Sequence, residues 1–111
     1  MDSKKDSSIN YMLHVIPAMK AAAYACGYAL TTHGSMMRDI DLVAIPWTDT
    51  AKSPRELIRE LSSACGGFVP VNGKIYHHPH KRISVAMFVT GSIMAIDLSI
   101  ILRSVDKVED F

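Results

Sequence analysis

The chain has 111 residues, of which 49% are hydrophobic and 21% charged, a composition that excludes a disordered protein and is typical of a globular one. Twelve lysine and arginine residues against 11 aspartate and glutamate residues give a net charge of +1, which argues against a long-range field that attracts nucleic acid. A nucleic-acid partner is therefore not favoured. The length predicts one domain over residues 1–111, with flexible ends at 1–8 and 105–111.

Cysteine usage and apolar runs indicate the compartment. Cys26 and Cys65 lie in apolar contexts without the spacing of a metal or disulfide motif, which fits a reducing environment. The first ten residues lack the order of a signal peptide. The uncharged, apolar-rich stretch 83–96 ends where Asp97 follows it. It is shorter than the roughly 20 residues that a membrane helix needs. We expect a cytoplasmic protein that does not contact a membrane.

The first half of the chain predicts one helix and two strands. The helix runs from Asn10, a candidate N-cap, to Gly27, which suits the left-handed position that closes a helix. Pro17 conflicts with an unbroken helix, so the helix either kinks there or begins there. Two strands follow over residues 28–32 and 40–47, joined by a tight connection. The second is almost entirely apolar and is expected to be central in a sheet.

The second predicted helix has a well-marked start and end. Ser53 is a candidate N-cap, Pro54 stands at the first helical position and Glu56 at the third, a pattern that favours helix initiation. Gly66 and Gly67 follow the last apolar residue of its periodic face and are expected to end it.

The remaining residues are typical of strands. The dipeptides Asn72-Gly73 and Gly91-Ser92 are hairpin signals. The order of helix, two strands, helix and several strands predicts an α+β fold, a mixed β-sheet with helices packed mainly on one face. The four expected strands of this part cover residues 68–71, 74–77, 82–90 and 93–102.

Three aspartates are the candidates for chemistry. Asp39 and Asp41 are two positions apart at the start of a predicted strand, so their side chains leave the same face. Two carboxylates at that separation repel each other, and a hard cation such as Mg²⁺ relieves the repulsion. Asp97 is the only charged residue between positions 83 and 102. Three carboxylates on neighbouring strands would suit a two-metal site for phosphoryl transfer.

Five positions resemble the nucleotidyltransferase superfamily, which includes DNA polymerase beta and the minimal nucleotidyltransferases. They are the Gly34-Ser35 pair after a strand, the Asp39-x-Asp41 pair entering the next strand, and Asp97 on a later one. The resemblance implies a palm core that transfers a nucleoside monophosphate from a nucleoside triphosphate such as ATP to a hydroxyl acceptor. It also implies that Gly34 and Ser35 contact phosphate, that Asp39 and Asp41 bind two Mg²⁺ ions, and that Asp97 is the third ligand and base.

The sequence departs from the family pattern in one place. Only Met36, Met37 and Arg38 separate the Gly-Ser turn from the first aspartate, where the family has a longer connection. Arg38 either supplies a positive charge to the nucleotide phosphates or pairs with its acidic neighbours. The alternative to an enzyme is therefore a catalytically inactive binding or regulatory module, or a subunit of a larger complex. A partner chain or a homodimer would have to supply the surface that holds an acceptor.

A basic stretch is the remaining candidate. No acidic residue occurs between Glu60 and Asp97. The histidines there lack cysteine partners and an ordinary zinc spacing, so a solvated loop is favoured over a metal site. The alternative role is to receive a triphosphate or a nucleic-acid backbone. The stretch contains Lys74, His77, His78, His80, Lys81 and Arg82.

Two further residues have open roles. Trp47 follows Pro46 at a strand end, where an aromatic side chain more often covers the rim of the core than stacks on a base. His33 is expected to fill the end of a strand, with a position in the site as the alternative.

Overall fold

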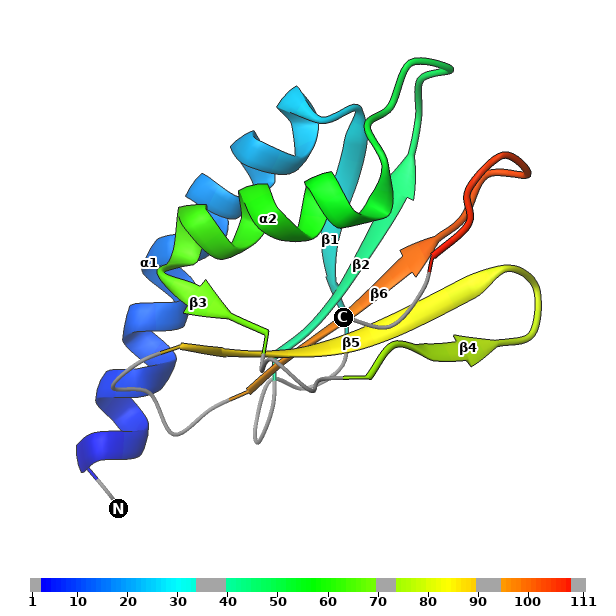
Figure 1. The fold of residues 1–111 in the computed structure, drawn as a ribbon. Helices are drawn as coiled ribbons and strands as arrows, with labels where there is room; N and C mark the ends of the chain where they lie inside the picture. The colour runs from blue at the N-terminus through cyan, green and yellow to red at the C-terminus, as the bar shows by residue number, and fades with distance from the viewer. Residues whose placement is uncertain (1–2, 34–39, 70–73, 90–94, 109–111) are drawn as a thin grey trace.

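The computed structural model describes residues 3–33, 40–69, 74–89 and 95–108. Within them the chain forms two helices and six strands, and the predicted α+β class is confirmed. Figure 1 shows their arrangement. The elements are α1 (Ser3–Ala25), β1 (Tyr28–His33), β2 (Ile40–Pro46), α2 (Pro54–Cys65), β3 (Gly67–Phe68), β4 (Tyr76–His78), β5 (Arg82–Val89) and β6 (Ala95–Ile101).

The described strands form one mixed sheet in the order β1-β2-β6-β5-β3, and β4 also pairs with β5. Only β2 and β6 run parallel among these pairs, and the other neighbours are antiparallel. Strand β2 lies between β1 and β6, so the prediction that the apolar strand is central is confirmed. The sheet thus brings β2 and β6, far apart in sequence, side by side.

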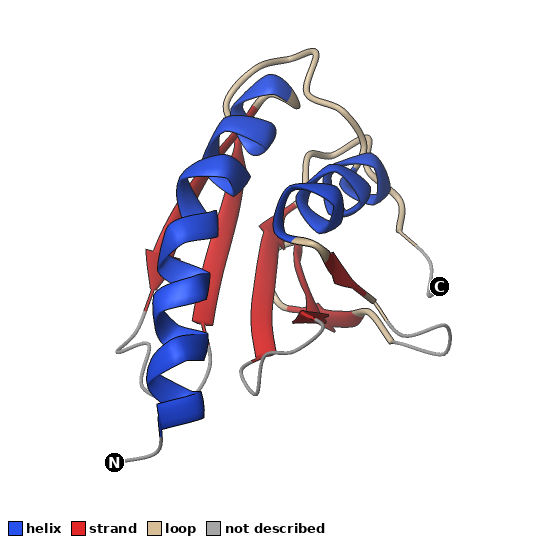
Figure 2. Ribbon diagram, turned by 90° about the vertical axis from the view of Figure 1, so that its left-hand side faces the viewer, coloured by secondary structure: helices blue, strands red, loops and turns tan. Residues whose placement is uncertain are grey.

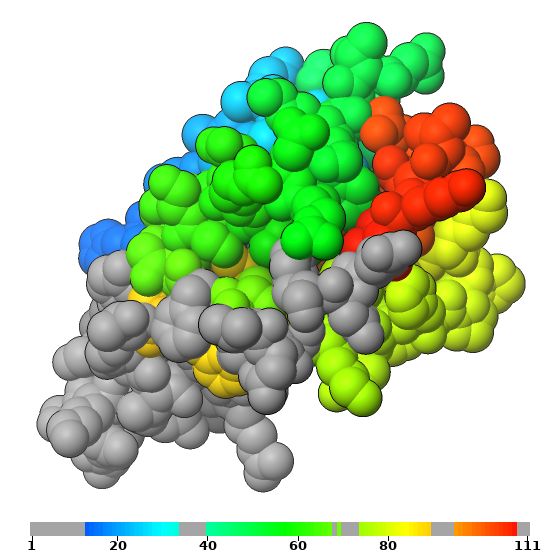
Figure 3. Space-filling model, viewed as in Figure 1, coloured from blue at the N-terminus to red at the C-terminus, as the bar shows by residue number. Residues whose placement is uncertain are grey.

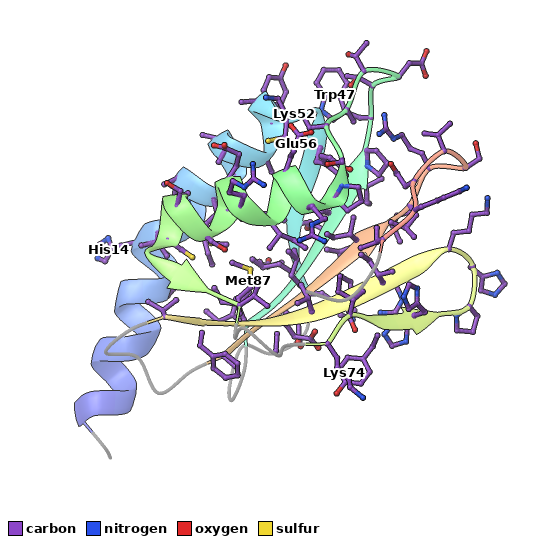
Figure 4. All side chains as sticks on the ribbon, in the orientation of Figure 1. His14, Trp47, Lys52, Glu56, Lys74 and Met87 are labelled. Atoms are coloured by element: carbon purple, nitrogen blue, oxygen red, sulfur yellow. The ribbon has the colours of Figure 1, made fainter. Side chains whose placement is uncertain are left out.

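Both helices lie over the same face of this sheet, as predicted (Figures 1 and 2). Helix α1 contacts β1 and α2, and α2 contacts β3. Apolar side chains alternate along the strands and point under the helices, where Met87 of β5 lies between the sheet and α2 (Figure 4). The core is built on this face. Its largest fully buried side chains are Met19, Tyr28, Ile40, Leu42, Leu57, Leu61, Ile83, Met87, Ile96, Leu98 and Ile100.

The opposite face of the sheet has no helix over it in the described part of the chain. Its side chains are the alternate residues of each strand, because successive residues of a strand point to opposite faces. We call it the open face. It consists of Ala29, Thr31, His33, Asp41, Val43, Ile45, Tyr76, His78, Arg82, Ser84, Ala86, Phe88, Ala95, Asp97, Ser99 and Ile101, all exposed or half-buried.

Helix α2 begins and ends as predicted. The Oγ of Ser53 accepts a hydrogen bond from the backbone N–H of Glu56 at 3.3 Å, and Pro54 occupies the first turn. Gly66 closes the helix with φ of 68° and donates its N–H to the carbonyl of Ser62. These contacts satisfy backbone groups that the ends of a helix leave without partners.

Helix α1 differs from the prediction at its start. It begins at Ser3, so Asn10 is an interior residue and not the N-cap, and Pro17 also lies inside the helix. Residues 3–16 contain no glycine or proline, so no residue with a strong penalty stops the helix before Asn10. Residues 3–8, for which we expected flexibility, belong to its first turns. Gly27 takes the predicted left-handed conformation, with φ of 87°.

Strands β3 and β4 are shorter than predicted. Strand β3 has two residues, because its pairing is limited to the last residues of β5, with Gly67 opposite Val89. The start of β4 is Tyr76, two residues later than expected. The dipeptides predicted as turns, at 72–73 and 91–92, lie outside the described residues.

The segment after β6 packs beside α2. Arg103 forms an ion pair with Asp106 at 3.0 Å, and its Nη1 donates to the carbonyl oxygen of Asp49 at 3.2 Å. Val108 is buried in the core. In Figure 3 this segment (red) lies against the residues of α2 (green). Asp106 and Val108 are therefore packed where flexibility was expected, whereas Val105 is exposed, and 109–111 lie outside the described residues.

Two other observations bear on the sequence-based expectations. Cys26 and Cys65 are buried thiols, and burial raises the pKa of both. Neither α1 nor α2, over the residues the structure describes, has the length and apolar character to cross a bilayer.

Candidate functional site

Asp41 of β2 and Asp97 of β6 lie directly opposite each other in the parallel register. Neighbouring strands are about 4.8 Å apart, and both side chains belong to the open face. Asp41 is half-buried and Asp97 is exposed. We call these two residues the carboxylate pair.

The same register extends the row across two more strands. His33 of β1 is opposite Asp41, and Ala86 of β5 is opposite Asp97. His33 therefore fills the end of a strand, as expected, and also shares a row with the carboxylate pair. Ala86 has a small side chain and is exposed. The sequence left a position in the site as the alternative for His33, and the register of β1 against β2 places it opposite Asp41.

A cation lies further along the open face. Arg82 of β5 donates from its Nη1 to the Oγ of Ser99 at 3.0 Å, and Ser99 is two positions after Asp97 on β6. This hydrogen bond fixes the guanidinium of Arg82 over β6. The neighbourhood of the carboxylate pair therefore combines negative charge at one end of β6 with positive charge at the other.

Four of the predicted site residues, Gly34, Ser35, Arg38 and Asp39, lie outside the described residues, so their roles stay predictions. Asp39 immediately precedes the first residue of β2. Within the described ranges, no three His, Cys, Asp or Glu side chains come together as a metal site. A complete site built on the carboxylate pair would therefore need a ligand such as Asp39.

The donor set of the carboxylate pair fits Mg²⁺. Both residues offer carboxylate oxygens, which are the ligands that this hard ion prefers. Two like charges directly opposite each other on neighbouring strands destabilise a sheet. A divalent cation at this position would remove that cost, and Asp41 and Asp97 would hold it.

The histidines of the basic stretch point in different directions. His78 shares the open face with Arg82, and its Nε2 lies 2.7 Å from the Oγ of Ser84. His77 is opposite Ile83, whose side chain is on the other face of the sheet. His80 belongs to the turn, with φ of 64°. The stretch is therefore a hairpin, as the strands predicted over 74–77 and 82–90 imply, and its turn at 79–81 is exposed to solvent.

Trp47 lies at the rim of the molecule. Its ring stacks on that of Tyr24 from α1, with centroids 5.2 Å apart, and it is 52% exposed. It follows Asp41 by six positions, about 20 Å along an extended chain. The predicted rim position agrees with this packing, whereas stacking on a base held at the carboxylate pair does not.

Comparisons with known proteins gave no match: no family model, curated protein or solved structure is similar to this chain. The resemblance to nucleotidyltransferases therefore depends on the five sequence positions and on where the fold places two of them.

Proposed function

We propose that the protein is a Mg²⁺-dependent nucleotidyltransferase that moves a nucleoside monophosphate from a nucleoside triphosphate to a hydroxyl acceptor. The observation that carries the proposal is the register of the parallel strands, which sets Asp41 opposite Asp97 on the open face. A palm-type core is part of the same proposal.

The residues have distinct roles in this reaction. Bound Mg²⁺ would neutralise charge on the phosphates and orient them for in-line displacement. Asp39, Asp41 and Asp97 would hold the metal, and Asp97 would also accept the proton of the acceptor hydroxyl. The acceptor oxygen forms a bond to the α-phosphorus as the bond from that phosphorus to the bridging oxygen breaks, and pyrophosphate leaves. Gly34, Ser35 and Arg38 are proposed to contact the phosphates.

A catalytically inactive module is the second candidate. Strands β1 and β2 are adjacent and antiparallel, and only residues 34–39 connect them. Six residues leave room for a single helical turn at most, at 3.6 residues per turn. A site with so short a phosphate-binding connection is consistent with nucleotide binding without turnover.

Nucleotide binding tests the site first. Equilibrium binding of each nucleoside triphosphate would be measured with and without Mg²⁺ for the wild type and Asp41→Asn. We expect the variant to lose at least about tenfold in Mg²⁺-dependent affinity, since even residues that only support metal ligands contribute that much. Asp49→Asn is the matched control, because Asp49 is exposed in the connection before α2. Equal affinity in wild type and Asp41→Asn would refute the site.

Transfer of label separates the enzyme from the module. The protein would be incubated with α-labelled nucleoside triphosphates, Mg²⁺ and a cell extract. Label on an acceptor, lost in Asp97→Asn, supports the transferase. Binding that depends on Asp41 without transfer to any acceptor supports the inactive module.

A further inference from the structure

The hairpin formed by β4 and β5 has a local excess of positive charge. We call residues 74–82 the basic hairpin. It carries Lys74, Lys81 and Arg82 with three histidines, and no acidic residue lies within it. Figure 4 shows Lys74 on the side of the sheet away from α2. The net charge of +1 therefore conceals a local cationic surface next to the open face.

Two exposed aromatic side chains lie on the open face of the same strands. Tyr76 of β4 is 60% exposed and Phe88 of β5 is 40% exposed. Tyr76 is opposite Ser84, so about 13 Å of extended chain separates the two aromatic positions along β5. Between them the open face carries Ser84 and Ala86, which are small. The aromatic rings can therefore be reached from solvent.

The turn of the basic hairpin holds two charged or polar side chains in a conformation that favours glycine. His80 and Lys81 have φ of 64° and 55°, and a side chain in this region is strained. The carbonyl oxygen of Lys81 accepts a hydrogen bond from the N–H of Leu102 at 2.8 Å, which attaches the turn to the end of β6. The backbone of Lys81 is thus held against the end of β6.

We propose that the basic hairpin and the adjoining open face bind single-stranded nucleic acid. Cations that follow a phosphate backbone, combined with aromatic rings on which bases stack, are the chemistry of such surfaces. A duplex is a poorer ligand, since its paired bases cannot reach Tyr76 or Phe88. This inference does not rest on the proposed transferase activity. Ala86 lies between the two aromatic positions and opposite Asp97, so a bound strand would pass the carboxylate pair.

Salt dependence tests the backbone contacts. Fluorescence anisotropy would follow binding of labelled oligothymidylate and oligouridylate in EDTA, without nucleoside triphosphate. Three phosphate contacts, from Lys74, Lys81 and Arg82, predict a loss of about 20-fold in affinity between 50 and 200 mM NaCl. The double variant Lys74→Gln, Lys81→Gln should retain a loss of only about threefold over that range. Lys20→Gln with Lys52→Gln is the control for the same charge removed elsewhere.

The aromatic contacts have a matched control in α1. Tyr76→Ala should weaken binding by roughly 5- to 100-fold, whereas Tyr24→Ala, which removes a tyrosine that is 67% exposed, should leave the affinity unchanged. Circular dichroism of each variant would confirm that it is folded.

Several results would overturn the inference. They are the absence of binding, affinity for a duplex equal to that for the single strand, and equal losses of affinity in the hairpin variants and their controls.

Asp41→Asn separates the two proposals. Oligonucleotide binding that survives in this variant, together with unchanged triphosphate binding, would contradict only the transferase. The reverse pattern, with Mg²⁺-dependent triphosphate binding but no oligonucleotide binding, would contradict only the nucleic-acid surface.

Discussion

Asp41 and Asp97 are the central residues of two identical tripeptides that pair with each other. Ile40-Asp41-Leu42 on β2 lies in register with Ile96-Asp97-Leu98 on β6, residue by residue. The isoleucines and leucines are buried under the helices, and this burial fixes the register, because a shift of either strand by one residue would bury its carboxylate and expose its isoleucine and leucine. The packing of the core therefore sets the two acids opposite each other.

The carboxylate pair should destabilise the protein when no cation is bound. We predict that Asp41→Asn raises the free energy of unfolding by about 0.2 to 1 kcal/mol in EDTA, because it removes a like charge opposite Asp97. Urea denaturation measures the change, with Asp49→Asn as the control. Mg²⁺ should then stabilise the wild type and have less effect on the variant. A variant that is less stable than the wild type in EDTA would contradict the expected repulsion.

The sequence predicted the parts of the fold that depend on local patterns. Ser53, Pro54 and Glu56 marked the start of α2, and Gly27 marked the turn after α1, because capping and left-handed positions require particular residue types. The predicted start of α1 at Asn10 was wrong, because residues 3–9 contain no signal that either starts or prevents a helix. The short β3 could not be foreseen because its length depends on the pairing with β5.

The candidate site was predicted less completely. Asp97 was predicted as a site residue because it is a lone charge in an apolar strand. The sequence also placed it on a strand near Asp39 and Asp41. The row that joins His33 to Asp41 and the hydrogen bond from Arg82 to Ser99 both depend on the register between neighbouring strands. Register follows from tertiary packing, so no local pattern indicated these neighbours.

Gly27 should tolerate no side chain. A Cβ at this position would lie 2.7 Å from the Oγ1 of Thr48 and 2.8 Å from the Cα of Ala51, in addition to the strain of a φ of 87°. We predict that Gly27→Ala lowers the free energy of unfolding by more than about 2 kcal/mol. Gly66→Ala is the control, because it introduces the strain of a left-handed position at an exposed residue and should cost about 1 kcal/mol. Equal costs for the two variants in urea denaturation would contradict the close approach.

Tyr28 should make stability depend on alkaline pH. Burial raises its pKa to about 12, and Asp106 contributes in the same direction. The folded protein keeps the phenol neutral while the unfolded chain ionises near pH 10. Its contribution is therefore complete below pH 10 and decreases by about 2 to 3 kcal/mol as the pH rises to about 12.

The Tyr28→Phe variant isolates this contribution. It loses the hydrogen bond from the Tyr28 hydroxyl to the carbonyl of Lys52 at 2.8 Å, so it should be less stable by about 1 kcal/mol at pH 7. Its stability should fall less than that of the wild type between pH 10 and 12. Tyr24→Phe, at an exposed tyrosine, should follow the wild type. Parallel alkaline profiles for the wild type and Tyr28→Phe would show that Tyr28 is not responsible.

The turn between β4 and β5 should become more stable when its strain is removed. Lys81 has φ of 55°, which glycine adopts without the penalty of a side chain, so Lys81→Gly should raise the free energy of unfolding by up to about 1 kcal/mol. Lys74→Gly removes the same charge at a position without positive φ and should lower it by about 0.5 to 1 kcal/mol, because glycine increases the entropy of the unfolded chain. If both variants lose stability equally in urea denaturation, the turn is not strained. A stability gain in Lys81→Gly with a loss in Lys74→Gly would mean that the chain keeps a lysine at the hairpin turn at a cost in stability. That result would favour a role for the charge of Lys81.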